Sequence, residues 1–160
     1  MSERRPPELG PRGEGWVVLQ SVLFAAIVAC GFAAVYWPDS VDSFLVVLGL
    51  VLVVVGAVVF VLGVVALGRS FTAFPRPRPR SEFRQSGIYR HVRHPIYGGV
   101  IVFALGWSLA ESPLALVPTF LLAVLFDLKA RREEAWLVER YPEYEAYRAR
   151  TARRFIPLVY

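Results

Sequence analysis

The sequence contains few of the residues that bind metals or form disulfides. Among its 160 residues there are one cysteine, two histidines and one methionine. Cys30 has no partner for an intrachain disulfide and lies inside an apolar run, and a single cysteine also excludes a cysteine-based zinc cluster. Since structural zinc sites use four Cys or His ligands, His91 and His94 alone do not suggest one. The sequence therefore predicts no bound metal.

Charge is also scarce. Charged residues make up 19% of the chain and hydrophobic residues 56%, whereas soluble domains have about 25% and about 45–50% respectively. This balance excludes a disordered chain and argues against an ordinary water-soluble globule. The length fits one domain, which we place over residues 1–160.

Four uncharged apolar runs predict an all-α, polytopic membrane protein. Trp16–Tyr36 and Phe44–Leu67 have 21 and 24 residues, and about 20 apolar residues suffice for a helix to cross the hydrocarbon core. Pro95–Ala110 and Pro113–Phe126 are shorter, which leaves a tilted hairpin or a re-entrant pair open. Helix-forming residues follow the fourth run, so we expect that helix to continue beyond the membrane. The four transmembrane helices are predicted over about 16–37, 43–67, 95–110 and 113–132.

The positions of the positive charges predict the orientation of these helices. All 18 Lys and Arg residues lie before the first run, between the second and third, or after the fourth. With four spans these segments share one side of the membrane, which the positive-inside rule makes cytoplasmic. Both termini and a C-terminal helical segment are therefore expected in the cytoplasm. Membrane lipids, rather than nucleic acid, are the expected partners of the net charge of +5.

Glycine recurs every seven residues in the second run, at Gly49, Gly56 and Gly63, so the three lie on one helical face. In lipid, small residues let helix backbones approach closely. Two uses of this face remain open at this point. The preferred one is packing inside the four-helix bundle, and the other is a homodimer seam.

Polar residues suited to chemistry concentrate in two segments on the basic side. In the first, Arg93 and His94 precede Pro95, a residue that suits the first position of a helix. They should lie at the mouth of the third span, where helix N–H groups favour an anion. In the second, Glu133 and Glu134 follow the fourth span. Taken singly, Arg93 and His94 are more typical of interfacial anchors, and Glu133 and Glu134 of a solvated helix face.

Together, however, the two segments resemble the isoprenylcysteine carboxyl methyltransferase family, which is related to the membrane phospholipid methyltransferases. The matching pieces are Ser86-Gly87-Ile88-Tyr89, Arg93-His94-Pro95-Ile96-Tyr97-Gly98, Glu133-Glu134-x-x-Leu137, and Tyr144-x-x-Tyr147 before Ile156-Pro157. The resemblance implies a multispan helical membrane enzyme that uses S-adenosylmethionine. It also implies cofactor-binding segments over residues 81–99 and 129–157.

The resemblance further implies individual site residues. Lys129 stands where the family often has an arginine at the substrate, and it keeps the charge without the planar fork that suits a carboxylate. An amine or hydroxyl acceptor would need a base, for which Glu134 or His94 is the candidate. Lys129 and Glu134 are therefore the candidate catalytic residues. The implied cofactor-binding residues are Phe83, Arg84, Tyr89, Arg93, His94, Pro95, Ile96, Tyr97 and Glu133.

The expected function is methyl transfer from S-adenosylmethionine to a lipophilic acceptor, either an isoprenoid or prenylcysteine carboxylate or a lipid. Two alternatives remain. The C-terminal part of membrane sterol reductases has similar motifs, which would imply an NADPH-dependent enzyme, and a non-catalytic membrane module is the other. A soluble dinucleotide-binding fold is not supported, because no Gly-x-Gly-x-x-Gly sequence follows a strand pattern.

Overall fold

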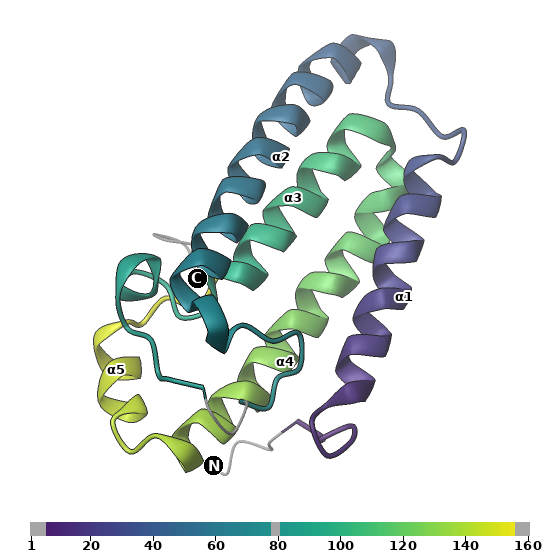
Figure 1. Ribbon diagram of the computed structural model, residues 1–160. Coiled ribbons are helices and arrows are strands. Elements are labelled where there is room, and N and C mark those ends of the chain that lie inside the picture. Colours follow the sequence, from purple (N-terminus) through teal and green to yellow (C-terminus); the bar gives the residue numbers. More distant parts are fainter. Residues whose placement is uncertain (1–5, 78–80, 156–160) are drawn as a thin grey trace.

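The computed structural model describes residues 6–77 and 81–155, and these residues form helices and connecting segments without a β-strand. Four long helices lie side by side, and a fifth, shorter helix lies at one end of them (Figure 1). The elements in chain order are α1 (Glu14–Gly31), α2 (Asp39–Leu67), η1 (Gly68–Ser70), η2 (Gly87–Arg90), α3 (Pro95–Glu111), η3 (Pro113–Ala115), α4 (Leu116–Arg140) and α5 (Tyr144–Arg150). The predicted all-α class is confirmed for the described residues.

Three helical stretches of the described chain are long and apolar enough to cross a membrane, namely Glu14–Gly31, Asp39–Ser70 and Pro113–Arg140. The helix α3 is apolar but has 17 residues, fewer than the about 20 that span the hydrocarbon core. It forms an antiparallel hairpin with α4 (Figure 1). The four-span count and the cytoplasmic location of the C-terminal segment stay predictions.

Several helix boundaries differ from the limits of the apolar runs, among them the ends of α1 and α4. The helix α1 ends at Gly31, although uncharged residues continue to Tyr36. A methyl group at Gly31 would overlap the indole of Trp107, and the ring of Phe32 packs edge-on against that indole with centroids 5.9 Å apart. At the other boundary, α4 continues without a break to Arg140, as the helix-forming residues after the fourth run predict.

The glycine face of α2 packs against α3. Methyl groups at Gly49 and Gly56 would overlap backbone atoms of Gly106, Gly99 and their neighbours, and one at Gly63 would press on Ile96. All three glycines are buried. These glycines therefore serve packing within the bundle, the preferred use, and this face cannot also form a homodimer seam. The possible homodimer itself stays a prediction.

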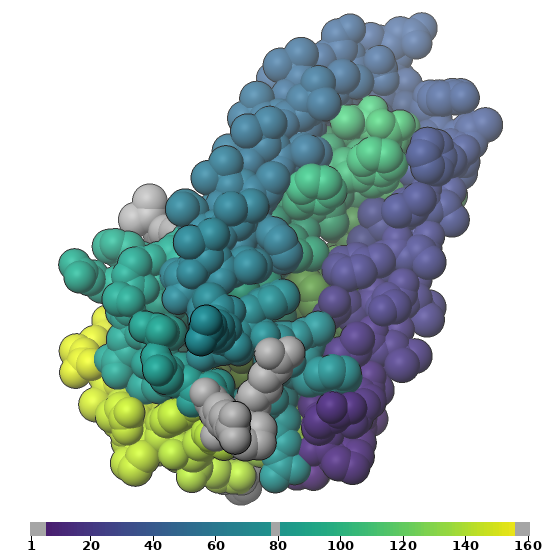
Figure 2. Space-filling view, in the orientation of Figure 1, coloured from purple at the N-terminus to yellow at the C-terminus, as the bar shows by residue number. Residues whose placement is uncertain are grey.

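The two ends of the bundle differ in character. The connections α1–α2 and α3–α4 share one end (Figure 1), where the Ser112 hydroxyl donates a 2.8 Å hydrogen bond to the carbonyl oxygen of Val35. The N-terminal segment, the α2–α3 connection and α5 gather at the opposite end (Figure 2). Every Lys and Arg residue that the structure describes lies in the elements or connections of this second end. The predicted site residues, from Phe83 to Tyr97 and from Lys129 to Glu134, lie in the elements and connections of this end.

Candidate active site

The residues before α3 are held by the C-terminal segment. The backbone N–H groups of Arg93 and His94 donate to the carbonyl oxygens of Arg153 and Arg154, at 3.1 and 2.8 Å. Pro95 then occupies the first turn of α3, where its missing N–H costs no hydrogen bond. A methyl group at Gly98 would overlap the carbonyl oxygen of Phe155. The motif around His94 thus sits between the bundle and the chain after α5.

A buried ionic network fixes Arg93 and His94. One carboxylate oxygen of Glu134 accepts a hydrogen bond from Arg93 Nε at 2.9 Å and lies 3.1 Å from His94 Nε2. The guanidinium of Arg93 also donates to the carbonyl oxygens of Thr151 and Ala152, at 2.7 and 2.6 Å. Because an ionised carboxylate only accepts, the Nε2 atom of His94 carries the proton in this bond. Glu134 therefore determines which edge of the His94 ring faces inward.

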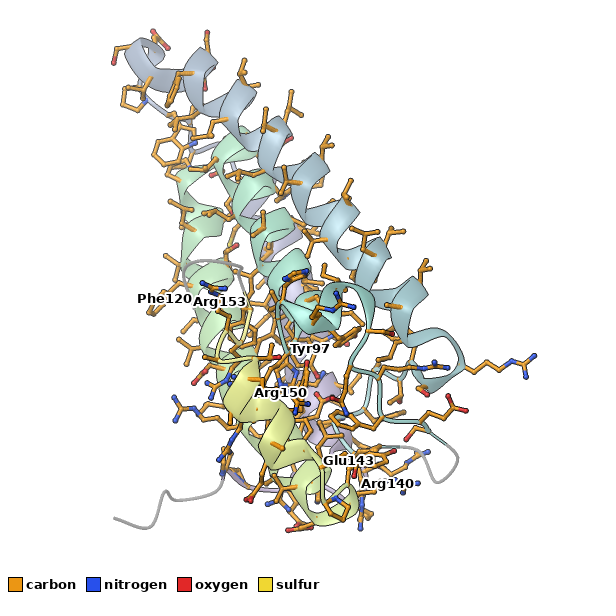
Figure 3. All side chains as sticks on the ribbon, turned by 90° about the vertical axis from the view of Figure 1, so that its left-hand side faces the viewer. Tyr97, Phe120, Arg140, Glu143, Arg150 and Arg153 are labelled. Atoms are coloured by element: carbon orange, nitrogen blue, oxygen red, sulfur yellow. The ribbon has the colours of Figure 1, made fainter. Side chains whose placement is uncertain are left out.

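Glu133 points elsewhere, because consecutive side chains on an α-helix are about 100° apart. Its carboxylate accepts a 2.7 Å hydrogen bond from the hydroxyl of Tyr97. The same carboxylate lies 3.9 Å from His94 Nδ1. The rings of His94 and Tyr97 stack with centroids 5.5 Å apart, and Tyr97 stacks in turn on Phe126 at 4.8 Å. Figure 3 shows Tyr97 inside this end of the molecule, with Arg140 at the rim.

These groups share one cavity with a volume of about 320 Å³, within the range of about 300–1,000 Å³ usual for small-molecule sites. The predicted site residues that line it are Phe83, Arg84, Tyr89, Arg93, His94, Ile96, Tyr97, Lys129 and Glu133. Pro95 is fully buried and Glu134 is 4% exposed, and neither is among the lining residues. The structure thus brings together nine of the predicted residues and places two behind the cavity wall.

One side of the cavity is aromatic. Phe83 packs against Tyr141, Tyr144 and Tyr147, with ring centroids 5.2–5.4 Å apart. The Tyr147 hydroxyl donates to the carbonyl oxygen of Tyr89 at 2.7 Å. Burial raises the pKa of Tyr147 to about 12 and raises the pKa values of Tyr89 and Tyr144 as well. These phenols are therefore neutral near pH 7 and offer aromatic faces to a ligand.

Another part of the cavity contains Lys129 among apolar side chains. Its ammonium donates to the Gln20 side-chain oxygen at 2.7 Å and to the Ala73 carbonyl oxygen at 3.0 Å. It lies 5.2 Å from the centre of the Tyr97 ring, within cation–π range. Around it the cavity is lined by the apolar side chains of Phe24, Phe60, Val100 and Phe126, from all four long helices. This half suits a lipophilic molecule with a polar end.

With this geometry in hand, similarity to known proteins identifies the family. A model of the phospholipid methyltransferase family matches residues 44–144. The chain belongs to this family. It is also similar to two rice proteins, from Oryza sativa subsp. indica and subsp. japonica, each named "Probable protein-S-isoprenylcysteine O-methyltransferase". The identity is 35% over 117 residues, which are 70% of this chain and 58% of each relative.

A third similar protein is the Delta(14)-sterol reductase of Mus musculus, which is 37% identical over 79 residues, 47% of this chain and 19% of that protein. The resemblance predicted from the motifs is confirmed by these matches. The chain spans about 58% of the length of the rice relatives. The match to the phospholipid methyltransferase family model thus runs from the first turns of α2 to the start of α5.

Sequence reasoning missed several lining residues of this phospholipid methyltransferase family member. Gln20 and Phe24 come from α1, and Phe71 to Pro75 come from the connection after α2. Gln20 is one of the few polar side chains in an apolar run, which could have marked it. The carbonyl oxygen of Ser81 accepts a 2.7 Å hydrogen bond from the Tyr141 hydroxyl. The motif residues Ile156 and Pro157 lie outside the described residues.

Proposed function

We propose that this chain is a membrane methyltransferase that uses S-adenosylmethionine and methylates a lipophilic acceptor with a carboxylate end, of the prenylcysteine type. The observation that carries the proposal is the convergence of His94, Glu133 and Lys129 on one cavity between polar connections and apolar helix faces. His94 comes from the segment before α3, and Lys129 and Glu133 come from α4. The named activity of the rice relatives supports it.

The side chains present fit the cofactor. The Glu133 carboxylate, which is 25% exposed, would accept hydrogen bonds from ribose hydroxyls or from the amino group. The aromatic faces of Phe83 and Tyr144 suit stacking with adenine and attraction of a cation. Arg84 at the rim would hold the methionyl carboxylate. When bound, the cofactor supplies an activated methyl group on a sulfonium.

The chain's own contribution is alignment and exclusion of water. The apolar half, with Phe24, Phe60 and Phe126, would hold the acceptor's hydrocarbon part, and Lys129 would attract its negative end. Holding both reactants in line replaces a bimolecular encounter and contributes on the order of 7–11 kcal/mol in well-oriented systems. A carboxylate acceptor needs no base.

Glu134 does not reach the cavity, because Arg93 and His94 occupy its carboxylate. We therefore propose that Glu134 is a positioning residue that fixes the His94 ring. His94 Nδ1, which faces Glu133, would contact the cofactor. Because Glu134 is held away from the cavity, the base for an amine or hydroxyl acceptor would be His94.

The test is incubation of the detergent-solubilised protein with methyl-labelled S-adenosylmethionine and, in separate reactions, an S-prenylcysteine, an isoprenoid acid or phosphatidylethanolamine. We expect label on the prenylcysteine carboxylate, detected by mass spectrometry, and loss of transfer in His94→Ala. His91→Ala is the matched control, because His91 is exposed and does not line the cavity. Label on phosphatidylethanolamine alone would contradict the acceptor class.

The similarity to Delta(14)-sterol reductase favours a second candidate, an NADPH-dependent reductase. Thermal stability of the purified protein with each cofactor separates the two. Stabilisation by NADPH and none by S-adenosylmethionine would replace the methyltransferase proposal by the reductase. Stabilisation by neither, with no labelled product, would indicate a non-catalytic membrane module.

A further inference from the structure

The ammonium of Lys129 is buried and makes no direct ion pair with a described residue. The residue is 1% exposed, and its hydrogen bonds go to two neutral oxygens, Gln20 Oε1 and the Ala73 carbonyl. Of the residues that the structure describes, no carboxylate lies within 4.0 Å of its Nζ atom. Buried charges in proteins are almost always paired or bound to a ligand. Glu133, four residues along α4, attracts the ammonium only from beyond this distance, so a ligand anion would supply the direct ion-pair partner that it lacks.

We propose that Gln20 determines the charge of the acceptor that this site takes. Its neutral carbonyl orients Lys129 without cancelling the positive charge, so the charge remains available to an anionic group on a lipophilic acceptor. The inference rests on the proposed methyltransferase function and names a specificity-determining residue for it. A carboxylate at position 20 would occupy the ammonium from within the protein.

The geometry also gives Gln20 a direct role. Its Oε1 atom faces Lys129 at 2.7 Å, so its amide NH₂, which carries two donors, points away from that bond. Gln20 and Phe24, one turn further along α1, both line the cavity. The amide and the ammonium can therefore bind an anionic head together, while Phe24 and the neighbouring apolar residues contact its hydrocarbon tail.

The position of Gln20 in the chain supports a role in specificity. The family model matches residues 44–144, which include His94, Lys129 and Glu133 but not α1. The residues proposed for the cofactor thus lie in or next to the segment shared with the family, and Gln20 lies outside it. Substitution at Gln20 should change acceptor use and leave cofactor binding intact.

The experiment compares Gln20→Glu with Gln20→Met in the full-length, detergent-solubilised protein. In Gln20→Glu, a carboxylate replaces the amide oxygen 2.7 Å from Lys129 and forms an internal ion pair. We expect the KM for an S-prenylcysteine carboxylate to rise about tenfold to a hundredfold, with the affinity for S-adenosylhomocysteine unchanged. Gln20→Met leaves the ammonium charged, so its KM should rise only a few-fold.

The chain offers a matched control, because its second glutamine, Gln85, does not line the cavity. Gln85→Glu adds the same charge and should leave the KM unchanged. An S-prenylcysteine KM in Gln20→Glu within twofold of the unmodified protein would overturn the inference. If the unmodified protein does not bind S-adenosylhomocysteine, the proposed function itself is refuted. The failure of the inference and the failure of the proposed function are therefore distinguishable.

A second measurement needs no variant, should Gln20→Glu fail to fold. The unmodified protein is offered competitors that share one prenyl tail and carry a carboxylate, a phosphate or an uncharged carboxamide. The inference predicts that both anionic competitors bind at least about tenfold more tightly than the carboxamide. Whichever of the carboxylate and the phosphate competes better indicates the anionic group of the acceptor. Equal competition by the carboxamide would overturn it.

Discussion

Removal of the Glu134 carboxylate, by Glu134→Ala, breaks the contacts that hold the His94 motif. Glu134 is 4% exposed and accepts from Arg93 at 2.9 Å and from His94 at 3.1 Å. Each hydrogen bond to a charged group contributes about 1.5–3 kcal/mol, and loss of one partner of a buried ion pair costs about 3–5 kcal/mol. We therefore expect a loss of about 3–5 kcal/mol, with the buried Arg93 left without its closest counter-ion.

The assay is thermal unfolding in detergent, with Glu139→Ala as the control for loss of a negative charge, since Glu139 is exposed on the same helix. For a chain of this size about 1 kcal/mol corresponds to about 2–4 °C, so Glu134→Ala should lower the Tm by about 10 °C. The control should change it by less than about 2 °C.

A double variant separates the ion pair from other effects. Replacing both charges, as in Arg93→Met with Glu134→Leu, leaves no unpaired buried charge and should cost less than the sum of the two single changes. A Tm of Glu134→Ala equal to that of the control, or strictly additive losses in the double variant, would refute the reasoning about this network.

Three further outcomes are expected. Gly56→Leu should prevent folding, because even a methyl group there overlaps the backbone of Gly99, and size-exclusion chromatography would show aggregate in place of a monodisperse peak. Tyr97→Phe removes the 2.7 Å hydrogen bond to Glu133 and should weaken S-adenosylhomocysteine binding about five- to twenty-fold at unchanged Tm. The raised pKa of Tyr147, about 12 against about 10 in the unfolded chain, gives stability that is complete below pH 10 and is lost as the pH rises towards 12. Tyr147→Phe should remove that part of the pH dependence in chemical denaturation, and an unaltered curve would contradict it.

The apolar runs predicted where the helices lie but not all of their ends. Hydrophobicity alone could not place the end of α1 at Gly31, since uncharged residues continue and the helix stops where Trp107 approaches it. The spacing of Gly56 and its two companions showed that one face of α2 is small. It could not tell whether α3 or a second copy covers that face, because both would use the same close approach.

The candidate site, like the fold, could be predicted from the sequence only in part. The motif resemblance predicted that His94 and Glu133 belong to one site, because each lies in a short motif of its own that the sequence shows directly. It assigned Glu133 to the cofactor and Glu134 to catalysis. It could not show that Glu134 faces Arg93 and His94 while Glu133 faces Tyr97, because that depends on how α4 packs. The contact between Gln20 and Lys129 joins residues 109 positions apart, and no local pattern predicts such a pair. Packing of α1 against α4 creates it.

Binding of S-adenosylhomocysteine, measured by isothermal titration calorimetry, tests the central claim most directly. The account predicts that the unmodified protein and His91→Ala bind with the same affinity, and that His94→Ala and Glu133→Ala each lose at least about tenfold, because both side chains line one cavity. Folded His94→Ala and Glu133→Ala proteins that bind as tightly as the unmodified protein would contradict it.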